Sequence, residues 1–578
     1  MIVLRWFKNA LLFIMKEIAS FLIKIVMVMI ILIILLTVFV PKTPVEKAPI
    51  RKNTYIELDL SNPVGERGSL SIFSMEGEKV NFYNMLNYLD KGKNDQRIEG
   101  LILKVDSVAL NRAQVEELGR KIKEYREVGK KVYAFSRGFQ NRNYSLAVNA
   151  DEIIMPPSRG AGSNISGYFM ELPYMKRLSD KIGIKYDVIH VGDYKSYGEN
   201  YVREEMSPEF RENITRLLDR IYYNFVQDVS VSRNIDERTL SRKILNGDFV
   251  LADAFKMKQE KLVDSLMYYH EFLKERKIAN ITTLGKYARS VVGHQSSGKK
   301  IAVIYGDGEI LYSNSGRGAQ QSITPDTMIS ELDMAVRDKN VVGIVLRIDS
   351  PGGSALASEV INAKIRSIEK PVYVSMGGTS ASGGYYISAS GDRIFAERDT
   401  VTGSIGVVSL VPDVSELAGK LGIKIESVQK GKLSGIYSIT DGMTKEERER
   451  IYESSSKIYS EFKERVSSGR NIPMSQMESL AGGRVWLGEE ALEKGLVDGI
   501  GGLQDTIKIL AKDLQLSEYS VVEIRRENPF EKLFMNYKYL ENFYNKLNSI
   551  LNMEINGKKE MLESELIIKP VTYLPYKI

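Results

Sequence analysis

The chain has 578 residues, too many for one hydrophobic core, so two or more domains are expected. Its net charge of +6 is small for this length and its basic residues form no stripe with interleaved aromatics, so nucleic-acid binding is not expected. The absence of cysteine excludes disulfides, thiolate metal sites and a cysteine nucleophile.

The first feature along the chain is an apolar run from Phe21 to Val40, interrupted only by Lys24 and Thr37. About twenty such residues span a bilayer, and the run lacks the small residues of a signal-peptide cleavage site. We therefore predict an uncleaved transmembrane helix within a stretch, residues 1–53, that also holds a cytoplasmic stub and a linker. A buried core helix is the alternative. Basic residues flank both ends almost equally, so the positive-inside rule does not orient the span.

An internal repeat organises the chain that follows. Four pairs of short segments recur in the same order: Gly100–Ser107 with Gly343–Ser350, Val132-Tyr133 with Val372-Tyr373, Lys181–Lys185 with Lys420–Lys424, and Leu262–Asp264 with Leu496–Asp498. We predict two copies of one domain, residues 54–295 and 296–523, followed by a C-terminal extension, 524–578, outside the repeat. In each copy short buried strands alternate with helices, which predicts an α/β fold with mostly parallel strands.

The two copies differ in two glycine-rich turns that only the second copy carries. These are Asp349-Ser-Pro-Gly-Gly-Ser354, opposite Asp106–Asn111, and Met376-Gly-Gly-Thr-Ser-Ala-Ser-Gly-Gly-Tyr385, opposite Ser136–Tyr144. Glycine lets the backbone approach a ligand, and N–H groups presented in this way can hold a developing oxyanion. Ser382 is therefore a candidate nucleophile. When the two copies are aligned, it corresponds to Asn141 or Arg142 of the first copy. Two tight turns without chemistry are the alternative.

A serine nucleophile needs a base. No histidine follows His294, which excludes the order in which the histidine comes after the serine. His190, His270 and His294 remain formally possible in another order. A buried lysine with a lowered pKa is the other known solution.

The first copy has its own distinctive segment, Val191-Gly-Asp-Tyr-Lys-Ser-Tyr-Gly198. In the alignment of the two copies, Lys195 corresponds to Ser434 of the second copy. The nearest lysine there, Lys432, stands two positions away. A lone lysine is usually a solvated surface charge, so this difference alone assigns no role.

Residues from about 54 to 510 resemble signal peptide peptidase A, also called protease IV, in the long tandem-repeat form of peptidase family S49. The motifs that carry the resemblance stand in the family's order: Gly192–Ser196 with Met206–Pro208, Ser350–Gly353, Ser380–Tyr385, Thr402–Gly406, and Gly483–Gly488 with Gly495–Asp498.

This resemblance implies two tandem domains of the Clp-protease/crotonase kind. It implies that Ser382 is the nucleophile, that Lys195 is its base and that Ser404 orients the lysine amine. The oxyanion donors map to the backbone of Gly353 and Gly383. No metal or cofactor is required.

The resemblance also implies a biological setting. The chain would be a serine endopeptidase, anchored by one span in the bacterial inner membrane, with its catalytic part on the periplasmic or extracytoplasmic side. It would assemble as a homotetramer and degrade signal peptides after their cleavage, so its partners would be peptides and the lipid bilayer. A crotonase-like acyl-CoA enzyme and a non-catalytic membrane scaffold are the alternatives. Cleavage specificity and the role of residues 524–578 stay open.

Overall fold

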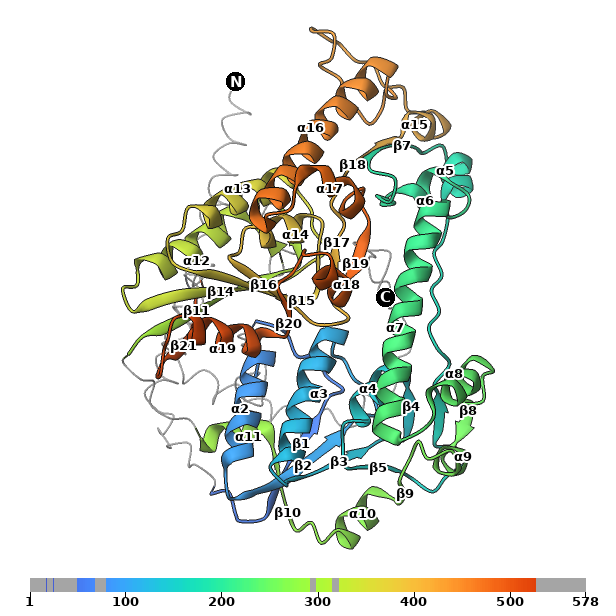
Figure 1. Cartoon of the computed structure of the whole chain (residues 1–578). Helices are drawn as coiled ribbons and strands as arrows, with labels where there is room; N and C mark the ends of the chain where they lie inside the picture. The colour runs from blue at the N-terminus through green and yellow to red at the C-terminus, as the bar shows by residue number, and fades with distance from the viewer. Residues whose placement is uncertain are drawn as a thin grey trace. The chain divides into compact units, whose positions relative to one another are not determined.

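The computed structural model describes residues 49–67, 80–291, 298–313 and 322–525, together with Glu17 and Lys24 (Figure 1). Apart from Lys24, the predicted membrane span lies outside these residues, as does nearly all of the C-terminal extension. Within the described ranges no helix has the length and apolar character needed to cross a membrane. The described residues from 49 to 525 belong to one compact unit.

The first repeat is built on a six-stranded parallel sheet in the order β10-β1-β2-β3-β5-β9. Its strands are β1 (Thr54–Asp59), β2 (Ile98–Lys104), β3 (Lys131–Phe135), β5 (Glu152–Met155), β9 (Ser265–Leu266) and β10 (Asn280–Thr283). The central strand β2 is apolar on both faces because helices cover both faces of a parallel sheet. Leu101, Ile102 and Leu103 are accordingly fully buried.

The second repeat has the same strand order, β21-β11-β14-β15-β16-β20, again with parallel pairs. The strands are β11 (Lys300–Asp307), β14 (Val341–Ser350), β15 (Val372–Ala381), β16 (Arg393–Ala396), β20 (Gly499–Ile500) and β21 (Ser520–Glu523). The predicted α/β class is therefore confirmed, and the two copies share one topology. The domain boundaries at 54, 295 and 523 stay predictions.

A smaller group of strands also recurs in both repeats. In the first, β4 (Gly138–Gln140) pairs in parallel with β6 (Gly162–Asn164), which pairs antiparallel with β8 (Val250–Asp253). In the second, the end of β15 takes the place of β4, followed by β17 (Val401–Gly403) and β19 (Val485–Leu487).

The longest helices of the two repeats also correspond. Helices α7 (Pro208–Arg233) and α16 (Lys445–Arg470) each have 26 residues. Ser207 and Thr444 cap their first turns, and Asn234 and Asn471 end them in the left-handed conformation.

The other helices in the described ranges from residue 49 onward connect the strands or cover the sheets. They are α2 (Phe82–Asn94), α3 (Arg112–Glu127), α4 (Asn141–Ala147), α5 (Lys176–Ile182), α6 (Glu199–Val202), α8 (Glu237–Leu245), α9 (Ala254–Gln259), α10 (Tyr269–Glu275), α11 (Leu284–Ser290), α12 (Pro325–Arg337), α13 (Ala355–Arg366), α14 (Gly383–Ser388), α15 (Ser415–Lys420), α17 (Met474–Leu480), α18 (Gly488–Glu493) and α19 (Leu503–Asp513). Two further strands, β12 (Glu309–Ile310) and β13 (Ser322–Ile323), form a small parallel pair.

Several contacts join the two repeats, including the following three. Strand β7 (Lys185–Val191) of the first pairs antiparallel with β18 (Val407–Asp413) of the second. One face of α7 packs its apolar side chains, among them Phe210 and Leu217, against Leu487. Helix α3 lies between the two large sheets and contacts β15 (Figure 1). Any site at this junction draws on both repeats.

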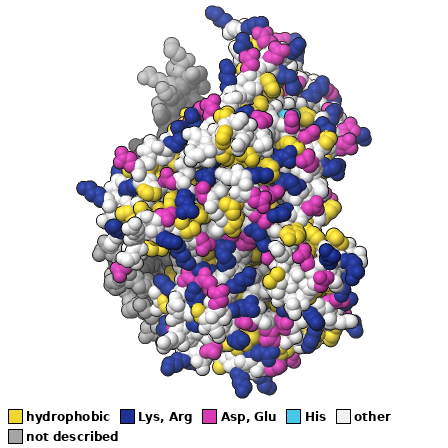
Figure 2. Space-filling model, in the orientation of Figure 1, with side chains coloured by type: hydrophobic (Ala, Val, Ile, Leu, Met, Phe, Trp, Pro, Cys, Tyr) yellow, Lys and Arg dark blue, Asp and Glu magenta, His cyan; other side chains and the backbone are white. Residues whose placement is uncertain are grey.

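Charged side chains of both signs are interspersed on the face shown in Figure 2. This mixture accords with the small net charge of +6. The junction between the repeats differs from this surface because it buries several charged groups, as described below.

Candidate active site

Ser382 stands where a strand turns sharply into a helix. Strand β15 ends at Ala381, and Ser382 is the cap residue of α14, with φ +54° and ψ −119°. This conformation is costly for any residue other than glycine and persists only where the surroundings hold it. Here the Ser382 N–H donates to the Gly403 carbonyl at 2.8 Å, and the Tyr386 N–H donates to the Ser382 carbonyl at 2.9 Å. Such a turn presents a serine hydroxyl at the end of the sheet.

The turn at Gly352-Gly353 packs directly against the start of α14. Gly353 has φ +147°, and a Cβ there would lie 2.1 Å from the Ile310 carbonyl oxygen. A Cβ on Gly352 would lie 2.7 Å from the Gly383 nitrogen. Within the described chain, no atom accepts a hydrogen bond from the N–H of Gly353 or Gly383. Two unengaged N–H groups beside a serine are what an oxyanion requires.

Lys195 reaches this serine because β7 pairs with β18. Val191 is opposite Val407, so the chain after β7 runs alongside the segment that begins at Ser404. The loop is held by the Tyr194 N–H, which donates to the Gly482 carbonyl at 2.8 Å. Gly483 has φ +83°, and a Cβ there would lie 2.5 Å from the Lys195 nitrogen. Only glycine permits this close approach of the first repeat to the second.

The Lys195 amine lies between two serine hydroxyls. Its Nζ is 2.9 Å from Ser382 Oγ, 2.9 Å from Ser404 Oγ and 3.0 Å from the Ser404 carbonyl oxygen. Lys195 is only 7% exposed, and among the described residues it forms no ion pair. Burial lowers the pKa of Lys195 to about 7 because the charged form loses its hydration. A substantial neutral fraction at neutral pH can accept the proton of a hydroxyl.

The structure thus brings together all five residues that the resemblance had singled out: Ser382, Lys195, Ser404, Gly353 and Gly383. The other candidates lie apart from this site. His190 and His270 are exposed, and His294 lies outside the described residues. Lys432 is an exposed side chain paired with Glu446 at 2.6 Å.

The structure also shows which residue of the first repeat is equivalent to Ser382. Tyr144 and Tyr385 each donate a hydroxyl hydrogen bond of 2.8 Å, to the carbonyls of Leu262 and Leu496 respectively. These two leucines are themselves equivalent in the repeat, so Tyr144 corresponds to Tyr385. Asn141 therefore corresponds to Ser382, and the first repeat has an amide where the second has a hydroxyl.

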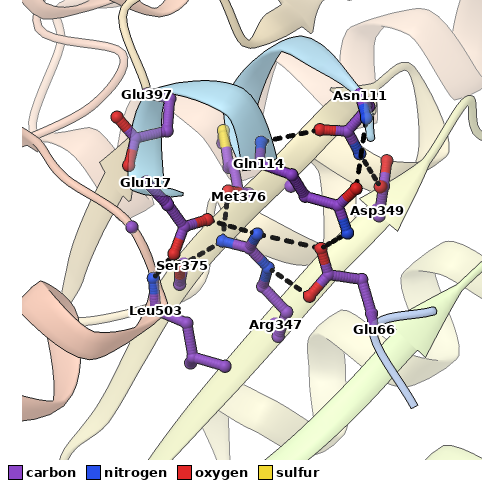
Figure 3. Close-up of polar contacts among 12 residues, drawn as sticks. Glu66, Asn111, Gln114, Glu117, Arg347, Asp349, Ser375, Met376, Glu397 and Leu503 are labelled. Atoms are coloured by element: carbon purple, nitrogen blue, oxygen red, sulfur yellow. Dashed lines mark hydrogen bonds and ion pairs between the residues drawn. The ribbon is translucent and has the colours of Figure 1, made fainter. Parts of the chain in front are cut away.

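Sequence reasoning missed a group of polar residues beside this site. Helix α3 and its cap carry Asn111, Gln114 and Glu117, three residues apart and therefore on one face. Gln114 and Glu117 are buried and Asn111 is partly buried, and all three face the second repeat (Figure 3). Their three-residue spacing is the one signal in the sequence that could have pointed to them.

The chain is similar to known proteins over most of its length. The family model "Peptidase family S49" matches residues 124–280 and 364–517, one segment in each repeat. "Protease 4" of Salmonella typhi is 31% identical over 76% of this chain and 73% of its own length. "Protease 4" of Haemophilus influenzae is 31% identical over 74% and 72%. "Serine protease SPPA, chloroplastic" of Arabidopsis thaliana is 30% identical over 75% and 66%.

The fold, the site and these matches define a serine peptidase. More particularly, the chain belongs to peptidase family S49. Peptides are therefore its substrates, and neither the acyl-CoA enzyme nor the non-catalytic scaffold accounts for these findings.

A solved structure of a ClpP1 mutant from Listeria monocytogenes aligns with 36% of this chain and 94% of that chain. The sequence identity is 16% and the TM-score is 0.25. Because the sequence identity and the TM-score are both low, assignment of the two repeats to the Clp-protease/crotonase kind of domain stays a prediction.

Proposed function

We propose that this peptidase uses Ser382 as its nucleophile and Lys195 as its general base, with one residue from each repeat. The single observation that carries the proposal is the 2.9 Å separation between Lys195 Nζ and Ser382 Oγ. The lowered pKa of the buried lysine, about 7, supports it because a general base must be neutral at the working pH.

The reaction follows from this geometry. Neutral Nζ takes the Oγ proton as Ser382 attacks the carbonyl carbon of the peptide, and the N–H groups of Gly353 and Gly383 stabilise the oxyanion. The protonated amine then gives its proton to the leaving nitrogen, which leaves an acyl ester on Ser382. Water hydrolyses this ester with Lys195 again as base. Ser404, 2.9 Å from Nζ, keeps the amine directed at Ser382 throughout.

The proposed setting is the extracytoplasmic side of the bacterial inner membrane, with one N-terminal span and a homotetrameric assembly. The apolar run at 21–40 supports the span, and the family resemblance supports the orientation, the assembly and the substrate class, which is cleaved signal peptides. These substrates are apolar and membrane-bound, so an anchor would keep the site near them.

Covalent labelling tests the catalytic assignment. The full chain is treated with a fluorophosphonate, digested and mapped by mass spectrometry, with Ser382→Ala as the control. We expect the label on Ser382 alone, and labelling of another serine in the wild type would contradict the proposal. Turnover of a synthetic signal peptide, compared with a polar peptide of equal length, tests the substrate class. Equal rates would contradict it.

A further inference from the structure

Asp349 lies at the junction of the two glycine-rich turns. In the pairing of β14 with β15, Ile348 is opposite Met376 but Ser350 is opposite Ser380, so residues 377–379 bulge opposite Asp349. The Asp349 carboxylate accepts a hydrogen bond from the Thr379 N–H at 2.9 Å. A Cβ on Gly377 would lie 2.7 Å from the Asp349 side chain. This carboxylate therefore holds the segment that leads to Ser382.

A residue of the first repeat completes this contact. Asn111 Nδ2 donates to the other Asp349 oxygen at 3.2 Å. Asn111 Oδ1 meanwhile caps α3 by accepting from the Gln114 N–H at 2.9 Å, so the amide is held at both ends (Figure 3). A Cβ on Gly378 would lie 2.8 Å from the Asn111 side chain. Gly377 and Gly378 thus leave space for the side chains of Asp349 and Asn111.

Arg347 binds the other end of the same bulge. This side chain is fully buried and donates to the Met376 carbonyl and to Ser375 Oγ, both at 2.9 Å. It also donates to Glu66 Oε1 at 3.0 Å and to Glu117 Oε1 at 2.6 Å (Figure 3). Both carboxylates come from the first repeat, so the bulge before Ser382 is tied at two points to that repeat.

Asp349 needs such a donor because its surroundings disfavour its charge. Burial, together with the charges of Glu66 and Asp307, raises the pKa of Asp349 to about 7. A hydrogen bond donated to a carboxylate stabilises the ionised form, which accepts from Thr379 and Asn111 together.

We infer that Asn111 is a positioning residue of the reaction: through Asp349 it fixes both the strand end that carries Ser382 and the turn that carries Gly353. The first repeat would then set the oxyanion geometry in addition to supplying the base. This inference rests on the proposed roles of Ser382 and Gly353. It assigns Asn111 no contact with substrate.

Asn111→Ser tests the inference, because serine still caps a helix but cannot carry the amide donor. The chain offers a closely matched control in Asn81. Asn81 caps α2 by accepting from the Asn84 N–H at 2.8 Å, and its Nδ2 donates across the repeats to Glu523 at 3.3 Å. Glu523, however, ends the edge strand β21 rather than leading into a catalytic turn.

With a fluorogenic peptide, we expect Asn111→Ser to lower kcat about tenfold with KM nearly unchanged, since positioning acts on the transition state. Asn81→Ser should keep the wild-type kcat, and the two variants should unfold at similar temperatures. Equal kcat values in the two variants would overturn the inference. A parallel Ser382→Ala measurement keeps the proposed function separate, since only its retained activity would refute the nucleophile.

An exchange of the two partners gives a second, independent test. Asp349→Asn alone and Asn111→Asp alone should each lower kcat, because each removes the matched donor and acceptor. In the double variant Asp at 111 still caps α3 and accepts from the amide at 349, while the Asn oxygen still accepts from Thr379. We expect the double variant to recover most of the lost kcat. A double variant no better than either single one would overturn the inference.

Discussion

Corresponding aspartates stand just after β2 in the first repeat and near the end of β14 in the second, but the two aspartates have different partners. Asp106 of the first repeat pairs with Arg137, whose side chain is 75% exposed. Asp349 of the second is partly buried and accepts hydrogen bonds from Thr379 and Asn111. The same position in one fold thus forms a surface ion pair in one copy and contacts the turn that leads to Ser382 in the other.

Other paired positions show the same division of roles. The first repeat has Asn141 where the second has Ser382, and its amide donates to the Gly167 carbonyl at 2.8 Å instead of facing a base. The second repeat has exposed Lys432 near the position that corresponds to Lys195. In the proposed site each copy supplies a part that the other lacks, so a change at one member of a pair should matter far more than the same change at its counterpart.

The largest difference is expected between Ser382→Ala and Asn141→Ala. The first removes the proposed nucleophile and should lower kcat/KM for a fluorogenic peptide by about 10⁴-fold or more. The second removes only a hydrogen bond in the first repeat and should leave kcat/KM within about threefold of the wild type. Comparable losses in the two variants would break the comparison.

Arg347 and Lys104 occupy the same strand position in the two repeats. The free energy of unfolding should fall far more in Arg347→Met than in Lys104→Met. Arg347 is fully buried, and its loss would leave Glu66 and Glu117 without their cation, which costs about 3–5 kcal/mol. Lys104 pairs with Glu57 at a partly exposed site, where the cost is about 0–1 kcal/mol. Chemical unfolding of both variants measures the difference, and equal midpoints would contradict it.

The pH dependence tests whether Lys195 acts as a neutral base. Its pKa is lowered to about 7, so the active, neutral form is lost as the pH falls below that value. We expect kcat/KM to fall about tenfold per pH unit below pH 7 and to level off above it. A rate that still climbs steeply above pH 9 would indicate a solvated lysine or a different base.

Much of the site could be predicted from the sequence because its motifs are local. Ser382, Gly353 and Gly383 stand in glycine-rich turns that the first copy lacks, and the repeat exposes that difference. The family resemblance was needed for Lys195 and Ser404, since a lone lysine or serine is common on a surface. It was also needed to choose Gly353 and Gly383 as the oxyanion donors. The α/β class followed from alternating strands and helices.

The contacts of Asn111 could not be predicted in this way. It lies 238 residues from Asp349, and nothing local reveals that α3 packs against β15 of the other repeat. Asn141 and Arg142 were equally good counterparts of Ser382 because a one-residue gap could be placed on either side. The hydrogen bonds of Tyr144 and Tyr385 resolved that choice.

The most direct test of a site shared by the two repeats is the peptidase activity of Lys195→Ala in the full chain, measured beside Lys432→Ala. The two lysines stand near corresponding positions, but one is buried beside Ser382 and the other is exposed and paired with Glu446. We predict that Lys195→Ala loses at least about a thousandfold in kcat while remaining folded. Lys432→Ala should match the wild type. Full activity in Lys195→Ala, or a comparable loss in Lys432→Ala, would contradict the account.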